Sequence, residues 1–402
     1  MGVRTNDADV LIAGGGVAGS ALAILLGRQG LRVELYERAS FPREKPCGEG
    51  LMPAGVAVLE RLGLAEAVGG VPFHGIRYHF GRRNLTGPFP RADGLPITGC
   101  AQRRKHLDQV LFQAAARTPG VQAWTGRMVN GPVRENGRVA GLRVDGEERR
   151  GELVVAADGA HSRIRKELEL DIAVRRKRLG ARAHFRVPEG REQPPWVDVF
   201  VQRGYELYVA SLPGREVLVA GLAEAEVARG SIERAFHSWW RGVPELAARL
   251  DGAEQVSEIL CASPLAGRAR AGVAPGVVLL GDAAGFSDPI TGGGMTQALL
   301  TSELLAKHVA QGFAGGNGWA AMFERERRAL LADYKRLTEA LLWLAQHPRL
   351  ADPIVAAIGA APGVLSHLIG VAGGQRQLWG LIGNGCGRLT DDFGARRGPA
   401  AR

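Results

Sequence analysis

The sequence lacks the cysteine pattern of a metal-binding or secreted protein. Its four cysteines lie far apart, and none belongs to a C-x-x-C pair: Cys47, Cys100, Cys261 and Cys386. They predict no zinc or other metal site and no disulfide framework. Free thiols suit a reducing compartment, and no signal-type segment opens the chain. We therefore expect a cytoplasmic protein.

Concentrated positive charge is also missing. The net charge is +10, from 51 Lys and Arg against 41 Asp and Glu, but no Lys/Arg-rich block stands out. We therefore expect an arginine-rich solvated surface that attracts anionic cofactors, and no nucleic-acid partner. The 402 residues, of which 46% are apolar, suffice for two globular domains or one composite domain.

No long apolar run is free of breaks. Residues 353–374 contain no Asp, Glu, Lys or Arg, but Pro353, Pro362 and Gly363 fall within this stretch. We expect these residues to interrupt it, so that no helix spans a membrane. Two interpretations stay open: helices packed on the rest of the protein, or a surface in peripheral contact with a membrane.

Glycine, by contrast, is abundant, with 57 residues. Near the N-terminus, Gly14, Gly16 and Gly19 have G-x-G-x-x-G spacing. An apolar strand pattern at 10–13 precedes them. A helix pattern to about residue 29 and a second strand at 31–36 follow. This strand–turn–helix context makes the motif a specific signal for dinucleotide binding.

Each residue of this motif has a physical role. Gly14 permits the sharp turn, Gly16 leaves room for a pyrophosphate, and Gly19 lets helix and strand pack closely. Glu37, at the end of the second strand, can accept hydrogen bonds from a ribose, which favours FAD or NAD over NADP. The predicted cofactor contacts here also include the neighbouring Ala18 and Arg38.

A proline-containing loop follows, with a helix from Pro53 to about residue 62. The loop resembles that of flavoproteins of the geranylgeranyl reductase type, whose pattern is close to F-P-R-x-K-P-C-G-x-G. The matching residues are Phe41, Pro42, Arg43, Lys45, Pro46, Cys47, Gly48 and Gly50. By this resemblance Cys47 and Gly48 lie beside the flavin ring. Cys47 could equally be a small buried thiol, and Arg43 and Lys45 are either loop charges or contacts to phosphate or to a nicotinamide donor.

Two further motifs resemble those of FAD proteins. A helix expected over 102–115 begins with Arg104, Leu107 and Asp108 in an R-x-x-L-D pattern, similar to the glutathione-reductase-type FAD fold. There the arginine contacts the cofactor; otherwise Arg104 is an exposed residue at a helix end. After an apolar strand at 153–157, the D-G motif of the aromatic hydroxylase family follows. It comprises Asp158, Gly159, Ser162 and Arg165, and in that family it bears on FAD and the nicotinamide donor.

The last motif follows an apolar strand at 277–280. Gly281 and Asp282 are succeeded by a loop and by a long helix from about residue 295. By resemblance to the hydroxylase superfamily, Asp282 bonds the ribityl or pyrophosphate region. The backbone N–H groups of Gly294 and Met295 meet the pyrimidine edge of the flavin, where a helix N-terminus stabilises negative charge. The predicted site also takes in Pro289 and Gly292.

This motif departs from the hydroxylases. They usually continue G-D-A-A-H and have Gly-x-Asn at the helix start, whereas this chain has Gly285 and Thr296. Its version, G-D-A-A-G-F-x-D-P-x-T-G-x-G, looks like the geranylgeranyl reductase branch. The departure weakens the case for a standard phenol hydroxylation site.

Together these motifs predict an α/β protein with a glutathione-reductase-type Rossmann FAD-binding fold, an inserted antiparallel-sheet substrate domain and a helical C-terminus. The FAD-binding domain comprises 1–70, 99–170 and 265–330, the substrate domain 71–98 and 171–264, and the helical segment 331–402. A β-meander is expected over 121–144. Tyr205 and Tyr208 either line the substrate pocket or are core aromatics.

The resemblance implies a non-covalent FAD and NAD(P)H as electron donor without a second Rossmann fingerprint. A monooxygenase acting on an apolar, phenolic or lipid-like substrate is favoured narrowly over a reductase of prenyl double bonds. A flavin-binding sensor without turnover is the non-enzyme alternative. The catalytic residues stay unknown, with Cys47 and Pro289 as candidates. No catalytic base is assigned, because none of the nine histidines lies in a motif. Substrate identity and oligomeric state stay open.

Overall fold

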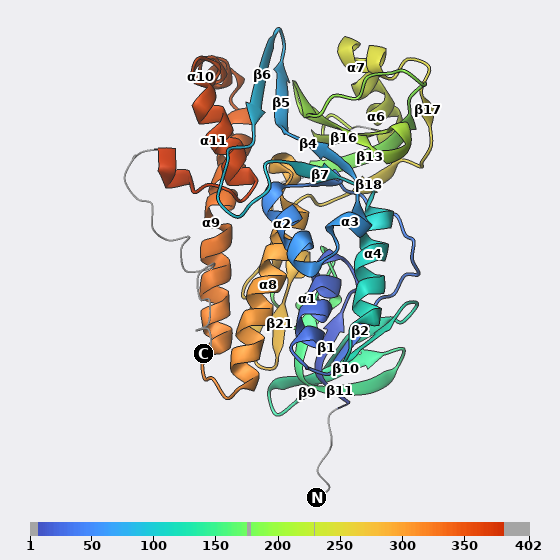
Figure 1. The fold of residues 1–402 in the computed structure, drawn as a ribbon, viewed down its shortest axis with the longest axis vertical. Helices are drawn as coiled ribbons and strands as arrows, with labels where there is room; N and C mark the ends of the chain where they lie inside the picture. The colour runs from blue at the N-terminus through green and yellow to red at the C-terminus, as the bar shows by residue number, and fades with distance from the viewer. Residues whose placement is uncertain (1–6, 175–177, 229, 382–402) are drawn as a thin grey trace, which may run out of the picture.

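A computed structural model describes residues 7–174, 178–228 and 230–381. Its main sheet has the strand order β20-β21-β11-β1-β2-β8, and β1, β2, β8, β11 and β21 are parallel (Figure 1). At its centre Ile12 lies between Val155 and Leu35. All three are fully buried, as expected for a parallel sheet covered on both faces. The strands are β1 Ala8–Ala13, β2 Val33–Tyr36, β8 Val121–Trp124, β11 Glu147–Ala156, β20 Val273–Ala274 and β21 Val277–Leu279.

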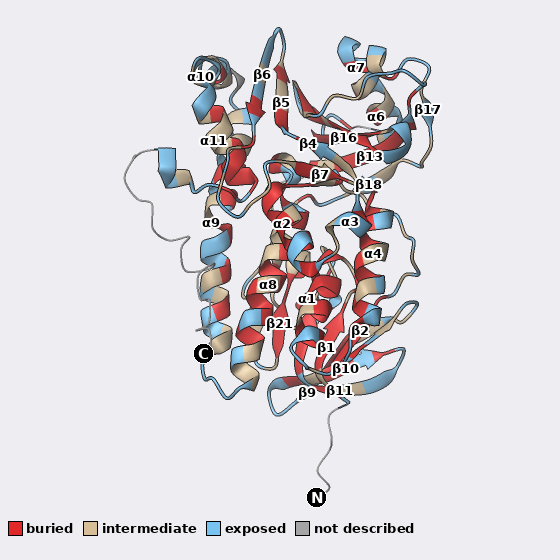
Figure 2. Cartoon of the chain, viewed as in Figure 1, coloured by how far each residue is buried: buried red, intermediate tan, exposed pale blue. Residues whose placement is uncertain are grey.

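Helices cover one face of this sheet and a β-hairpin covers the other. The helical core contains α1 (Val17–Arg28), α2 (Pro53–Leu62), α4 (Arg104–Arg117) and α8 (Gly294–Phe313). Figure 2 shows these elements buried where they meet the sheet. The hairpin consists of β9 (Val129–Glu135) and β10 (Arg138–Val144), which continue into the long strand β11.

The meander expected over 121–144 is only partly correct. β9, β10 and β11 are antiparallel neighbours, but β8 pairs in parallel with β2 at the edge of the main sheet. The reason is topological. β8 follows helix α4, which returns the chain to the same end of the sheet, and such a crossover produces parallel pairing.

A second sheet lies above the main one (Figure 1). Its order is β17-β13-β16-β15-β14-β5-β6, and all pairs are antiparallel except β14 with β5. One face packs against α6 (Ile232–Arg241) and α7 (Pro244–Arg249), and the other turns toward the main unit. The predicted fold class is confirmed; the exact domain limits remain a prediction. The strands are β5 Gly75–Phe80, β6 Arg83–Pro88, β13 Arg178–Arg186, β14 Val197–Gln202, β15 Tyr205–Leu212, β16 Glu216–Glu224 and β17 Glu254–Gln255.

Three helices close the described chain: α9 (Trp319–Ala345), α10 (Pro348–Ala360) and α11 (Pro362–Ala372). The expectation that Pro353 and Gly363 interrupt this segment is wrong, because Pro353 lies inside α10 and Gly363 lies in the first turn of α11. Tertiary context can override such local signals. The break falls at Pro362. Within the described residues no single helix is long and apolar enough to cross a membrane; Arg349–Ala360 and Pro362–Ala372 meet that test only as a pair bent by 104°. Residues 382–402 of the predicted helical segment lie outside the described residues.

Candidate functional site

The glycine turn after β1 combines close packing with open space. A Cβ added to Gly14, whose φ is +105°, would lie 2.3 Å from the carbonyl oxygen of Ala157. One added to Gly19 would lie 1.9 Å from the carbonyl oxygen of Gly14. Gly16 differs, because the nearest atom is Nη2 of Arg43 at 3.6 Å. The turn is therefore closely packed at Gly14 and Gly19 but leaves open space at Gly16. This open space lies at the start of α1, where no side chain caps the helix.

Glu37 is fixed at the carboxyl end of β2. Its carboxylate is buried and accepts hydrogen bonds from the backbone N–H groups of Gly15 (2.9 Å) and Ala39 (3.0 Å). Each oxygen has further acceptor capacity that a ribose hydroxyl could use. Arg43 lies 3.7 Å from this carboxylate and 2.9 Å from that of Asp108, which places its positive charge over the glycine turn. Arg38 is exposed.

The other two motifs meet the first at the same edge of the sheet. Ala18 lies 3.1 Å from the Cβ position of Gly281. Nζ of Lys45 lies 4.0 Å from Oδ2 of Asp282 and 4.0 Å from the Cβ position of Gly159. Residues far apart in sequence therefore converge where the parallel strands end, which is where open α/β sheets bind ligands.

The residues of the D-G motif make hydrogen bonds to nearby backbone groups, including those of the motif around Asp282. Asp158 accepts hydrogen bonds from the N–H groups of Arg163 and Ile164, and its other oxygen is buried without a partner among the described residues. Burial raises the pKa of this carboxyl group. The buried Arg165 donates from Nη1 to the carbonyl oxygens of Asp282 and Ala283, both at 3.1 Å, and so fixes the last motif.

Arg104 is not an exposed residue at a helix end, so that interpretation is wrong. It is 5% exposed and donates to both carboxylate oxygens of Asp108, at 2.8 and 2.9 Å. Burial disfavours the charge on Arg104, but Asp108 and the Cys47 sulfur outweigh burial and raise its pKa above the ordinary value. The half-buried Cys47 accepts a hydrogen bond from Glu49 N–H at 3.3 Å. Gly48 has open space at its Cβ position.

The start of α8 has open space on one side and is held on the other by a hydrogen bond. Gly293 donates its N–H to the Tyr334 hydroxyl at 3.0 Å, while Gly294 has no atom within 4 Å of its Cβ position. No side chain caps this helix. Met295 is buried in the core, so only its backbone can serve a ligand. Pro289 and Gly292, with φ +71°, belong to the exposed turn before the helix.

Sequence reasoning missed a buried pair beside the Cys47 loop. Glu49, with φ +56°, lies 2.8 Å through Oε2 from Nε2 of His184, and both side chains are fully buried. Its other oxygen accepts the N–H of Arg104 at 3.0 Å. No local pattern could have identified this pair, because the two residues are 135 positions apart.

The two predicted pocket tyrosines lie on opposite faces of the second sheet. Tyr205 stacks on Trp239 of α6, with ring centroids 5.5 Å apart, and faces away from the motifs. Tyr208 faces the main unit, and its hydroxyl donates to the carbonyl oxygen of Ile290 at 2.8 Å. Only Tyr208 is brought to the site.

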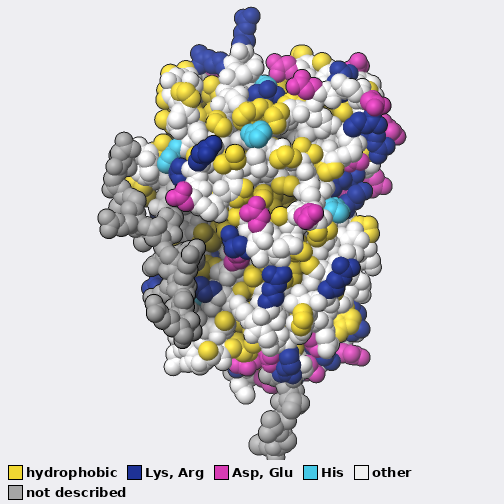
Figure 3. Space-filling model, viewed as in Figure 1, with side chains coloured by type: hydrophobic (Ala, Val, Ile, Leu, Met, Phe, Trp, Pro, Cys, Tyr) yellow, Lys and Arg dark blue, Asp and Glu magenta, His cyan; other side chains and the backbone are white. Residues whose placement is uncertain are grey.

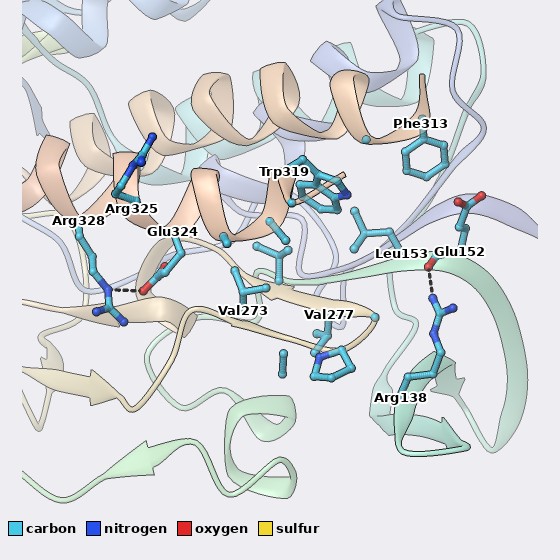
Figure 4. A pocket seen from close by; sticks show the side chains of 18 residues that line it. Arg138, Glu152, Leu153, Val273, Val277, Phe313, Trp319, Glu324, Arg325 and Arg328 are labelled. Carbon is cyan, nitrogen blue, oxygen red and sulfur yellow. Dashed lines mark hydrogen bonds and ion pairs between the residues drawn. The ribbon is translucent and has the colours of Figure 1, made fainter. Parts of the chain in front are cut away.

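A large open pocket lies elsewhere. It has a volume of about 980 Å³ and lies between the β20–β21 hairpin, the end of α8 and the start of α9, beside Phe313 and Trp319 (Figure 4). From Gly294 to Gly312 the axis of α8 rises about 27 Å. The pocket is therefore at the opposite end of this helix from the motifs, and we assign it no role in the site.

The residues that are brought together fit FAD. Gly16, Gly48 and Gly294 offer backbone next to open space, and Arg43 and Lys45 supply positive charge for a pyrophosphate. The individual contacts remain predictions. Within residues 7–174, 178–228 and 230–381, no group of three or more His, Cys, Asp or Glu could hold a metal ion.

Comparison with known proteins agrees with this geometry. Residues 7–335 match the family described as FAD binding domain. The menaquinone reductase of Mycolicibacterium smegmatis is 28% identical over 324 residues, which cover 76% of this chain and 77% of that protein. The squalene monooxygenase of Mus musculus is 28% identical over 319 residues, covering 74% and 54%. The digeranylgeranylglycerophospholipid reductase of Methanothrix thermoacetophila is 27% identical over 349 residues, covering 80% and 83%.

Solved structures share the fold. A flavoprotein/dehydrogenase from Cytophaga hutchinsonii has a TM-score of 0.80 at 20% identity, covering 91% of this chain and 92% of that one. A flavin-dependent brominase has a TM-score of 0.78 at 21% identity, covering 91% and 93%. The matched span includes all the motifs described above, and the chain therefore belongs to the FAD binding domain family and is an FAD-dependent oxidoreductase.

Proposed function

We propose that this flavoenzyme uses NAD(P)H to reduce a hydrophobic substrate with a prenyl-type chain. The observation that carries the proposal is the Cys47–Gly48 loop, which lies against the buried Arg104–Asp108 pair and close to the start of the motif around Asp282. This loop matches the geranylgeranyl reductase pattern. Relatives that are covered over three quarters of their length include a menaquinone reductase and a digeranylgeranylglycerophospholipid reductase, which supports the same class of substrate.

Bound FAD would supply electron transfer between the nicotinamide and the substrate. The chain's own residues bind and orient it. The open N-terminus of α1 and Arg43 would hold the pyrophosphate, and Glu37 the ribose. The N-terminus of α8 would stabilise negative charge on the reduced ring. The second sheet covers this edge, and Tyr208 fixes the loop before α8.

Monooxygenation, which the sequence favoured narrowly, is the second candidate. Similarity to squalene monooxygenase and, over 169 residues at 36% identity, to the 6-methylpretetramide 4-monooxygenase of Streptomyces rimosus supports it. Both chemistries need an apolar pocket that excludes water. They differ in the fate of dioxygen.

One experiment separates the candidates. The purified yellow protein is mixed with NADPH or NADH and a polyprenyl quinone or prenyl lipid, with and without ¹⁸O₂. A product that gains two hydrogens under nitrogen supports the reductase. Label in the product identifies a monooxygenase and overturns the proposal. If no candidate substrate accelerates NAD(P)H oxidation, the third candidate, a flavin-binding sensor, is favoured.

We also propose that this protein is cytoplasmic and touches a lipid surface through its C-terminal helices. Leu350 and Ile354 lie one turn apart on α10 and are 47% and 40% exposed, and Trp343 nearby is 49% exposed. Arg349 adds positive charge beside them. Figure 3 shows hydrophobic side chains over this part of the molecule. Exposed apolar residues grouped in this way favour interfacial contact.

Vesicle sedimentation tests this contact. Replacing both Leu350 and Ile354 by Asp should abolish binding to vesicles that contain anionic lipid. Met128→Asp is the matched control, because Met128 is 44% exposed just before β9, in another part of the protein. Equal binding by the wild type and the double variant, or no binding by the wild type, would contradict this contact.

A further inference from the structure

One strand of the second sheet has two very different faces. Along β13, the side chains of Ala181, Ala183 and Phe185 pack into the apolar core beneath α6 and α7. The alternate positions carry Arg178, Arg182 and His184, which are 4%, 2% and 0% exposed. Charged and polar side chains are rarely buried this deeply without partners. Here the carboxylate partners come from the FAD-binding loops or from strands β15 and β16.

Arg178 holds the loop before α8. Its Nη1 donates to Oδ1 of Asp288 at 2.7 Å, and its Nη2 donates to Glu206 on β15. Asp288 in turn accepts the N–H of Ile290 at 3.1 Å, and the turn that begins there leads directly into the N-terminus of α8. The position of this turn is therefore set by the second sheet.

Arg182 and His184 hold the loop that carries Cys47. Nη2 of Arg182 donates to Oε2 of Glu44 at 2.5 Å and to the carbonyl oxygen of Lys45 at 3.1 Å. His184 contacts Glu49 at 2.8 Å. Both ends of the segment 44–49 are thus attached to β13, and Cys47 and Gly48 lie between them.

From Arg178 to His184 the strand extends about 20 Å. β13 has β16 on one side and β17 and β18 (Leu260–Ala262) on the other, so it is a rigid element. We propose that Arg178, Arg182 and His184 are positioning residues that hold the two FAD-binding loops at a fixed separation. The inference rests on FAD binding, which the family assignment supports, and not on the choice between reduction and oxygenation.

The physical reason lies in how the loops act on the cofactor. In the FAD-loaded protein the start of α8 would act on charge in the flavin ring through its dipole, and this effect decreases steeply with distance. The net contribution of a buried ion pair to stability is small, and these pairs join β13 to both loops. Loosening one loop should therefore change FAD affinity and flavin midpoint potential.

The test uses the purified FAD-loaded protein and needs no substrate. Arg178→Met and Arg182→Met are compared with Arg186→Met, on the same strand and face but 47% exposed and ion-paired only at 3.5 and 3.8 Å, with Glu216 and Glu254. Each buried variant should raise the FAD dissociation constant roughly ten-fold and shift the flavin midpoint potential, while the control stays within about two-fold. Arg182→Lys, which keeps the charge, should restore part of the affinity.

Glu44→Gln tests the same contact from the loop, where the side chain is 33% exposed and substitution should be tolerated. It should give the same direction of change as Arg182→Met, and the double variant should add little. If Glu44→Gln and every buried Met variant that folds leave both FAD affinity and midpoint potential at the wild-type values, the inference is overturned. If the protein reduces no prenyl substrate, the expected changes in FAD affinity and midpoint potential still hold. That result would count only against the proposed function.

Discussion

Gly19 approaches Gly14 so closely that a Cβ added to Gly19 would lie 1.9 Å from the carbonyl oxygen of Gly14. This contact brings the first turn of α1 against the end of β1. Gly16, between them, has no such neighbour. The three glycines of one motif therefore divide into two physical roles, close packing and ligand access.

This division predicts different effects of substitution. Gly19→Val should destabilise the fold by about 3 kcal/mol or more, because the clash is with backbone. Gly16→Val should leave the urea midpoint of the apoprotein unchanged but weaken FAD binding on the order of 100-fold. Equal loss of folding stability in both variants would contradict the assignment of Gly16 to ligand access.

The Arg104–Asp108 pair gives a second prediction. Asp108→Ala leaves a buried guanidinium without its main partner, although Arg43 also loses its contact. We expect the free energy of unfolding in urea to fall by about 3–5 kcal/mol. Glu303→Ala is the control, because it breaks the surface pair with Arg61, whose side chain is 51% exposed, and should change stability by less than about 1 kcal/mol.

Glu206 should make stability pH-dependent. Burial raises the pKa of Glu206 to about 7, against the opposing influence of Arg178. The folded state therefore holds a proton that the unfolded chain has already released. This contribution is complete below about pH 4.5 and is lost as pH rises through about 7.

The measurement compares the wild type with Glu206→Gln. Between pH 5 and pH 8 (roughly the window in which the linkage acts), the wild type should lose up to about 3 kcal/mol more stability than the variant. Thermal or urea unfolding at several pH values in the same buffer series gives this difference. Parallel curves for the two proteins would show that Glu206 is already ionised in the folded state.

Tyr334 provides the fourth prediction. Tyr334→Phe keeps the ring against Gly293 but removes the acceptor for its N–H. An unsatisfied buried donor costs about 1–3 kcal/mol, and the turn before α8 should loosen, so both melting temperature and FAD affinity should fall. Tyr205→Phe is the matched control, since its hydroxyl makes only a 3.5 Å contact with Trp239. A change in Tyr205→Phe as large as that in Tyr334→Phe would refute this explanation.

Much of the FAD-binding unit could be predicted from the sequence because its signals are local. The strand, glycine turn and helix around Gly14 lie within about twenty residues. The same holds for the strand before Asp282 and for α8, whose observed start at Gly294 is one residue from the predicted one. The expectation for Pro353 failed because a single local signal was overridden by the helix around it.

The faces of the second sheet could not be assigned in the same way. Tyr205 and Tyr208 look equivalent in sequence, yet an odd separation along a strand places them on opposite faces. Which face meets the FAD-binding loops depends on how the sheets pack. The sequence contains no signal for that packing within either strand.

The sequence by itself determined the cofactor class and the order of the motifs, because each motif is a short run of backbone geometry and glycine placement. Only the tertiary structure decided that Arg178, Arg182 and His184 point at Asp288, Glu44 and Glu49. Those partners lie 110 to 138 residues away, and a charged side chain does not encode which distant charge will neutralise it. The folded structure determines the pairing, because a buried charge is stable only next to an opposite charge, and the fold decides which one is close enough.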